Sequence, residues 1–203
     1  MKAMRSILAL VAVALLLGAC GPKVKLAHLD KGATVLAFGD SLTFGTGASQ
    51  AEAYPAQLAR LTGLNVVNAG VPGEVSADGV ARLPDVMADA SPKLLILCHG
   101  GNDFLQKKDE GVAAKNIRTM IQMAKSQGIA VLLLATPKPG IPPSVPKFYS
   151  EIAEQEHIAF EDSVLRDVLF DNSLKSDMVH PNGRGYAKIA EALAKVLKKA
   201  GAI

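Results

Sequence analysis

Four polar side chains with the chemistry of acyl transfer stand at three separate places in this 203-residue chain. Ser41 follows an apolar run at 35–38, and Asn102 follows a second apolar run. Asp177 and His180 lie three positions apart near the C-terminal end. A serine hydroxyl, an imidazole and a carboxylate supply a nucleophile, its base and the group that orients the base, and an amide donates to an oxyanion. These residue types indicate attack on an acyl carbonyl, provided that the fold gathers them.

The pattern of apolar residues predicts an alternating α/β fold. Short apolar runs of strand type are separated by segments with apolar residues at three- and four-residue spacing, as in amphipathic helices. Such alternation is typical of a parallel sheet with helices on both faces, so we expect a three-layer α/β/α domain with about five strands. The carboxyl ends of parallel strands meet at one edge, where the four side chains would converge. The expected strands are 34–38, 65–68, 94–98, 130–134 and 158–160, and the expected helices are 52–61, 76–83, a further short piece from Pro84, 112–126, 147–155 and 182–199.

Composition and charge exclude several classes of protein. Hydrophobic residues make up 49% and charged residues 20% of the chain, which excludes a disordered protein. The net charge of +3 comes without a basic tract interleaved with aromatic residues, so we expect no nucleic-acid partner. The sequence has no Walker A or dinucleotide-binding glycine motif, and no Cys/His cluster has metal-ligand spacing. We therefore expect no cofactor and no metal, and no obligate protein partner is evident.

The first twenty residues have the features of a targeting segment. Lys2 and Arg5 precede an apolar stretch at 7–17, which is too short to span a hydrocarbon core of about 30 Å. The Leu-Gly-Ala-Cys sequence that follows resembles the bacterial lipoprotein signal, which implies removal of residues 1–19 and lipidation of Cys20. A simple secretory signal or an uncleaved anchor is the alternative.

The lipoprotein signal also implies an organisation and a location. Residues 20–32 are interpreted as a lipidated N-terminus and polar tether, and residues 33–203 as the folded domain. Gly21 in place of an aspartate favours, by the same resemblance, the outer membrane of the bacterial cell envelope, with the domain facing the periplasm and a lipid anchor as its membrane contact. With Cys20 lipidated, Cys98 is left alone in an apolar strand, and we expect it to be a small buried residue.

Four sequence blocks resemble those of the SGNH (GDSL) hydrolases, close in pattern to the bacterial thioesterase I/lysophospholipase/arylesterase group. They occur in the family's order, and the resemblance covers nearly all of residues 33–203. Met178 departs from the pattern, because glycine is frequent after the aspartate of the last block. The chain lacks the Gly-x-Ser-x-Gly elbow of the α/β-hydrolases. The blocks are Phe-Gly-Asp-Ser-Leu at 38–42, Asn-Ala-Gly-Val-Pro-Gly-Glu at 68–74, Gly-Gly-Asn-Asp at 100–103 and Asp-Met-Val-His-Pro-Asn at 177–182.

The resemblance implies a flavodoxin-like sheet and a role for each block. Ser41 is then the nucleophile, His180 its base, and Asp177 the carboxylate that holds the imidazole. The oxyanion would meet the backbone N–H groups of Ser41 and Gly73 and the side-chain amide of Asn102. Beside these roles we interpret the remaining polar residues as structural: Asp40 and Asp103 as acceptors that fix loops, His99 as a neighbour of the site, and Asn182 as a helix N-cap.

The loops expected around Ser41 are mostly small or apolar, which indicates an apolar acyl site. They are 43–49, 71–72, 104–105 and 139–145. We expect a serine esterase or thioesterase that hydrolyses short- to medium-chain acyl or aryl esters, and lysophospholipids are a further candidate substrate. A carbohydrate or peptidoglycan O-acetylesterase of the same fold is the alternative. The third hypothesis is a lipoprotein that uses the fold only to bind an envelope ligand.

Overall fold

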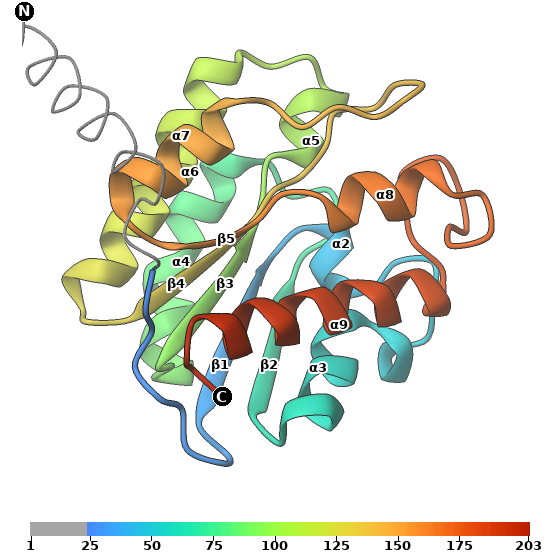
Figure 1. The fold of residues 1–203 in the computed structure, drawn as a ribbon. Coiled ribbons are helices and arrows are strands. Elements are labelled where there is room, and N and C mark those ends of the chain that lie inside the picture. The colour runs from blue at the N-terminus through green and yellow to red at the C-terminus, as the bar shows by residue number, and fades with distance from the viewer. Residues whose placement is uncertain (1–23) are drawn as a thin grey trace, which may run out of the picture.

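The computed structural model describes residues 24–203, which form a parallel sheet with helices on both faces (Figure 1). The sheet has five strands in the order β2-β1-β3-β4-β5, and all neighbours are parallel. This is the flavodoxin-like order, in which the direction of winding reverses between β1 and β3. The expected fold class is confirmed. The strands are β1 Thr34–Gly39, β2 Asn65–Gly70, β3 Leu94–Cys98, β4 Ala130–Leu134 and β5 Ala159–Glu161.

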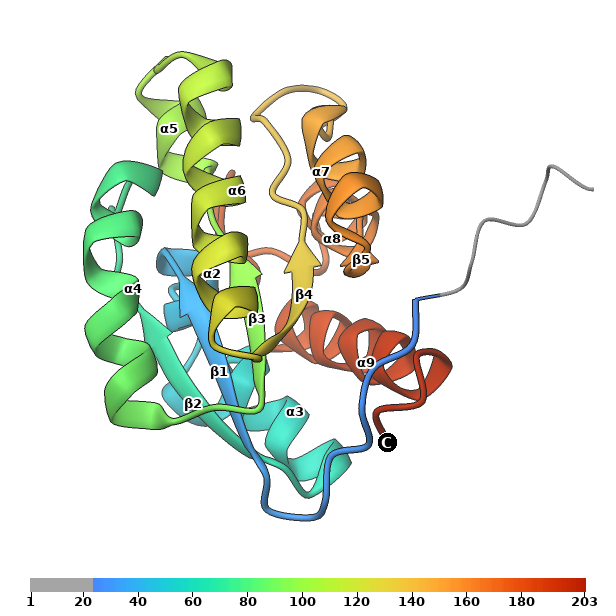
Figure 2. The same cartoon turned by 90° about the vertical axis from the view of Figure 1, so that its left-hand side faces the viewer.

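Alternate side chains of the strands point to opposite faces of the sheet and pack into two separate apolar cores. Val35 and Ala37 belong to the core under α3, α8 and α9, whereas Leu36 and Phe38 belong to the core under α4, α6 and α7. Figure 2 shows α4 and α6 on one side of the sheet and α3 and α9 on the other. The two cores fix the strand ends on which the site is built. The helices are α2 Ser41–Phe44, α3 Tyr54–Thr62, α4 Ser76–Ala90, α5 Gly101–Leu105, α6 Glu110–Ser126, α7 Phe148–Glu156, α8 Val164–Phe170 and α9 Gly183–Lys199, with a 3₁₀ turn at Gln50–Glu52.

Helix α4 differs from its prediction. Two helical pieces meeting at Pro84 were expected, but Ser76–Ala90 is one continuous helix with the proline inside it. Pro84 lies on the exposed side, while Leu83 and Met87 are buried in the core, so packing holds the helix together in spite of the missing N–H. The short helices α2, α5 and α8 were not predicted, because four to seven residues are too few to show a helical period.

The chain ahead of β1 packs on the domain. The N–H groups of Leu26 and Leu29 donate to the carbonyls of Ala200 and Ala202, at 2.9 and 2.8 Å, and Leu29 is buried in the α9 core. Residues 26–29 therefore lie against the C-terminal end of the chain. The signal segment and Cys20 lie outside the described residues, and from residue 24 onwards no helix is long and apolar enough to cross a bilayer.

Candidate active site

Ser41 stands where β1 ends and α2 begins, at the carboxyl edge of the sheet. A β-carbon at Gly39 would lie 2.1 Å from the carbonyl oxygen of Cys98, so only glycine lets β1 end this close to β3. Asp40 caps α2, and its Oδ1 accepts a hydrogen bond from the N–H of Leu42 at 3.0 Å. Burial raises the pKa of the Asp40 carboxyl. The carboxylate fixes the turn, as expected, and presents the next residue to the edge.

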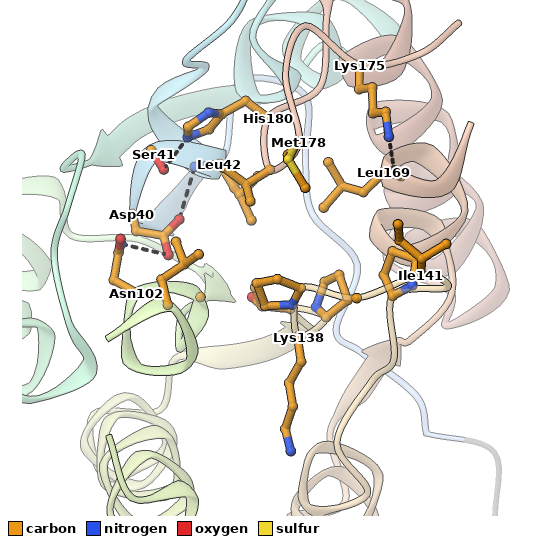
Figure 3. Close-up of a pocket in the computed structure, with 18 residues that line it drawn as sticks. Asp40, Ser41, Leu42, Asn102, Lys138, Ile141, Leu169, Lys175, Met178 and His180 are labelled. Carbon is orange, nitrogen blue, oxygen red and sulfur yellow. Dashed lines mark hydrogen bonds between the residues drawn. The ribbon is translucent and has the colours of Figure 1, made fainter. Parts of the chain in front are cut away.

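His180 and Asp177 reach Ser41 from the loop before α9. His180 Nε2 lies 3.0 Å from Ser41 Oγ (Figure 3). His180 Nδ1 lies 2.8 Å from Asp177 Oδ2. Asp177 Oδ1 also accepts from the N–H groups of Val179 and His180, at 2.8 and 2.9 Å. Partial burial acts to raise the pKa of Asp177, but these hydrogen bonds outweigh it and hold the pKa below its usual value. One tight turn therefore supplies an ionised carboxylate and the imidazole bonded to it.

Asn102 enters the site from the first turn of α5, directly after β3. Its Nδ2 donates to the carbonyl of Glu74 at 3.0 Å and makes a longer contact of 3.4 Å to Asp40 Oδ2. The next residue, Asp103, accepts two hydrogen bonds from Ser76, from N–H at 2.8 Å and from Oγ at 2.7 Å. Asp103 thus joins the start of α4 to the start of α5, which confirms its expected structural role.

Gly73 occupies a tight turn between β2 and α4. Its φ is +82°, in the left-handed region, and the N–H of Glu74 closes the turn on the carbonyl of Val71 at 3.2 Å. Proline followed by glycine is the sequence preferred for a type II turn. A β-carbon at Gly73 would meet nothing within 4 Å, so the backbone conformation rather than crowding explains the glycine. Gly73 does not line the cavity described next, although its neighbour Glu74 binds Asn102.

A mostly apolar cavity of about 160 Å³ opens beside Ser41 and His180 (Figure 3). Of the residues expected to form it, Leu105, residues 139–141 and Pro143 line the cavity, whereas 43–49, 71–72, Phe104, Pro142 and 144–145 do not. Pro137 and Lys138 line it without having been predicted. Leu169 on α8 and Val179 were not predicted as walls, because their distance in sequence from Ser41 gives no signal. Met178, the departure from the family pattern, is 79% exposed and lies at the cavity.

Two lysines also line the cavity, but their charges are directed elsewhere. The amine of Lys138 points away from it in Figure 3 and pairs with Glu110. Lys175 Nζ donates to the carbonyl of Leu169 at 3.1 Å. The walls that face Ser41 are therefore dominated by leucine, isoleucine, methionine and proline side chains.

The remaining residues singled out from the sequence are structural. Cys98 is buried, and burial raises the pKa of its thiol, so it is not a reactive group. His99 is fully buried and bonds to Glu74, not to Ser41. Asn182 caps α9 by accepting from the N–H of Gly185 at 3.1 Å. Within residues 24–203 no group of three or more His, Cys, Asp or Glu side chains is arranged to hold a metal ion.

Comparison with known proteins shows to which family the chain belongs. The sequence pattern of the GDSL-like lipase/acylhydrolase family matches residues 37–188, which include all four blocks. The chain belongs to this family. Its relatives include the esterase TesA of Pseudomonas aeruginosa, 30% identical over 91% of this chain and 98% of that protein. The thioesterase 1/protease 1/lysophospholipase L1 of Escherichia coli is 28% identical over 81% and 83% of the two chains.

Solved structures give the same result. The crystal structure of TesA has a TM-score of 0.72 at 29% identity and covers 82% of this chain and 99% of its own. The SGNH-hydrolase family esterase AlinE4 has a TM-score of 0.64 at 29% identity, covering 85% and 98%. The named relatives are carboxylic ester hydrolases, and this member of the family is an enzyme of that class.

Proposed function

We propose that the protein is a serine esterase and thioesterase, in which Ser41 attacks the acyl carbonyl of short- to medium-chain acyl or aryl substrates. The observation that carries the proposal is the continuous hydrogen-bonded series from Ser41 Oγ to His180 and on to Asp177, at 3.0 and 2.8 Å. Both distances lie in the range that proton transfer requires. A scaffold that only bound a ligand would have no need of this alignment beside an open cavity.

The first half of the reaction forms an acyl-enzyme. Asp177 accepts from Nδ1 of His180, which leaves Nε2 free to take the proton of Ser41 as its oxygen bonds to the carbonyl carbon. Asp177 stabilises the resulting imidazolium. When the tetrahedral intermediate collapses, the bond to the leaving oxygen or sulfur breaks, and His180 gives its proton to that atom. In the second half, a water molecule repeats the same steps and releases the acid.

The developing oxyanion needs donors that are in place before the reaction. We assign this role to the side-chain amide of Asn102 and the backbone N–H groups of Ser41 and Gly73. Ser41 is the first residue of α2, where a backbone N–H has no acceptor within its own helix. Of the two contacts of the Asn102 amide, the one to Asp40 is long at 3.4 Å and hence weak. A substrate oxygen can replace it while the bond to Glu74 keeps the amide oriented.

The apolar walls of the cavity suit an acyl chain longer than acetyl. Rates on p-nitrophenyl esters from acetate to dodecanoate, together with rates on O-acetylated glycans, test this part of the proposal. We expect kcat/KM to rise from acetate to a maximum between butyrate and octanoate. Much faster turnover of O-acetylated glycans than of every aryl ester would instead favour the O-acetylesterase alternative.

Thioesters and lysophospholipids are proposed as further substrates, because the Escherichia coli relative is named a thioesterase and lysophospholipase. Acyl-coenzyme A hydrolysis followed by free thiol, and fatty acid release from a lysophosphatidylcholine, measure the two activities. Each should disappear together with aryl ester hydrolysis when Ser41 is replaced by alanine.

We further propose that Cys20 carries a lipid that anchors the domain to the cell envelope, at the periplasmic face of the outer membrane. The support is the sequence ahead of Cys20, since this segment lies outside the described residues. Labelled palmitate should be incorporated into the protein in a diderm bacterium, and Cys20→Ser should abolish both the label and recovery in the membrane fraction. Palmitate incorporation into the Cys20→Ser protein would contradict this assignment.

A further inference from the structure

Glu74 carries a buried carboxylate that takes no part in the proposed reaction. The residue lies next to two of the proposed oxyanion donors, the backbone N–H of Gly73 and the side-chain amide of Asn102. The Glu74 side chain is only 5% exposed. Arg82 binds it through two hydrogen bonds, Nε to Oε1 at 2.6 Å and Nη2 to Oε2 at 2.7 Å. His99 Nε2 lies 3.0 Å from Oε2. Burial acts to raise the pKa of Glu74, but these partners outweigh it and hold the pKa below its usual value, so the carboxylate stays ionised at neutral pH.

The partners of Glu74 connect the ends of three strands. Arg82 also donates to the carbonyl of Ala69 at the end of β2, at 3.1 Å, and its guanidinium lies 4.1 Å from the ring centroid of Phe38 in β1. His99 directly follows β3, and its ring lies 5.9 Å from that of Phe38. Glu74 is therefore the point at which the strands that precede Ser41, Gly73 and Asn102 are joined to one another.

The main chain of Glu74 is joined to the oxyanion donors by one covalent neighbour and one hydrogen bond. Gly73 precedes Glu74 in the chain, and the carbonyl of Glu74 accepts from Asn102 Nδ2 at 3.0 Å. Glu74 thus holds the Asn102 amide through its own carbonyl and directly follows Gly73, which supplies the backbone N–H donor. A β-carbon at Gly73 would meet nothing within 4 Å, so no neighbouring atom packs against the turn at this position.

We propose that Glu74 is a positioning residue, whose ion pair with Arg82 and bond to His99 set the separation of the Gly73 and Asn102 donors without touching the substrate. This inference rests on the proposed function of the same site. The contacts of Glu74 with Arg82 and His99 form a clamp on the 71–74 turn. Without this clamp the turn can shift, and a displacement of about 1 Å costs up to about 100-fold in rate. Because the donors act on the transition state, the loss falls on kcat while KM changes little.

The test is Glu74→Gln, which keeps the shape of the side chain and removes its charge. Rates are normalised to the concentration of active sites titrated with a fluorophosphonate, so that partial unfolding does not lower them. We expect kcat to fall about 10- to 100-fold, with KM within about threefold of the wild-type value. Glu156→Gln is the matched control, because Glu156 binds Arg118 and Lys125 between α6 and α7, away from the cavity. Its kcat should not change.

A double-mutant cycle shows whether Glu74 acts through Asn102. In an Asn102→Ala background the further loss of kcat from Glu74→Gln should be clearly smaller than in the wild type, because one of the two donors that Glu74 positions is already gone. Arg82→Gln, which breaks the same ion pair from its more exposed partner, should reproduce both the loss of kcat and its reduction in the Asn102→Ala background, and serves if Glu74→Gln does not fold. Unchanged kcat per active site in the clamp variants, or losses that simply multiply with that of Asn102→Ala, would overturn the proposal.

Failure of this inference is distinct from failure of the proposed function. An active wild-type enzyme that needs Ser41, combined with a Glu74→Gln variant of normal kcat, contradicts the role of Glu74 alone. Wild-type protein without Ser41-dependent esterase activity contradicts both.

Discussion

His180 Nε2 lies 3.0 Å from Ser41 Oγ, although 139 positions separate the two residues in the chain. The fold produces this contact, because Ser41 follows the interior strand β1 at the carboxyl edge of the sheet, and His180 lies in the loop that leads into α9. Asp177, from the same loop, completes the series at 2.8 Å.

Asp177→Asn should lower kcat by about 10²- to 10⁴-fold, because an amide at this position no longer favours the imidazole tautomer that accepts the serine proton. Stability should change little, since the Asp177 side chain is 53% exposed and asparagine keeps an oxygen for the two backbone N–H groups. Asp171→Asn is the control, as Asp171 accepts a backbone N–H from Ser173 in the same loop region. An Asp177→Asn enzyme as active as this control would contradict the assigned role.

Asn102→Ala should reduce kcat about 100-fold, corresponding to about 3 kcal/mol of transition-state stabilisation, with KM nearly unchanged. Steady-state rates on p-nitrophenyl butyrate measure it. Asn65→Ala removes an exposed asparagine that bonds Thr34 and should leave kcat intact. A rise in KM at constant kcat would show instead that Asn102 binds the ground state.

Met178→Gln should reduce kcat/KM for octanoate about fivefold while leaving acetate unchanged. The substitution keeps the size of the side chain but makes a wall of the cavity polar, which removes about 1 kcal/mol of apolar contact with a long acyl chain. Leu61→Gln is the control, because Leu61 is 56% exposed on α3 and does not line the cavity. Equal losses on octanoate and acetate would argue against an acyl-binding role for Met178.

The pH dependence of stability should reveal the charge of Glu74. Since its pKa is lowered in the folded state, the stability that it provides is complete at neutral pH and is lost as the pH falls through the folded-state value. Glu74→Gln should therefore be less stable than wild type at pH 7, and the difference should narrow below about pH 4, near the ordinary glutamate pKa. Urea unfolding at both pH values measures the difference, and a constant difference would indicate that lost packing, not lost charge, destabilises the variant.

The sequence predicted the strands and the family's four sequence blocks well, because apolar runs and short polar motifs are local signals. A short, uninterrupted apolar run such as Leu94–Cys98 is typical of a buried parallel strand, so the run itself predicts the element. The path of α4 through Pro84 was not predictable, since it depends on the burial of Leu83 and Met87 against distant strands. The walls of the cavity were predicted only in part: Leu169 comes from a short helix that only the tertiary structure brings to Ser41. Glu74 was visible as part of a motif, but its clamp joins residues of three strands and left no local pattern.

Labelling with a fluorophosphonate, followed by mass spectrometry of the modified peptide and by an esterase assay, identifies the nucleophile. The wild-type enzyme should take up one label, on Ser41, and lose its activity in proportion. Ser41→Ala should fold with wild-type stability, take up no label and hydrolyse p-nitrophenyl butyrate at least about 1000-fold more slowly. Label on another serine, or Ser41→Ala activity within a few-fold of wild type, would contradict the assignment of Ser41 as the nucleophile.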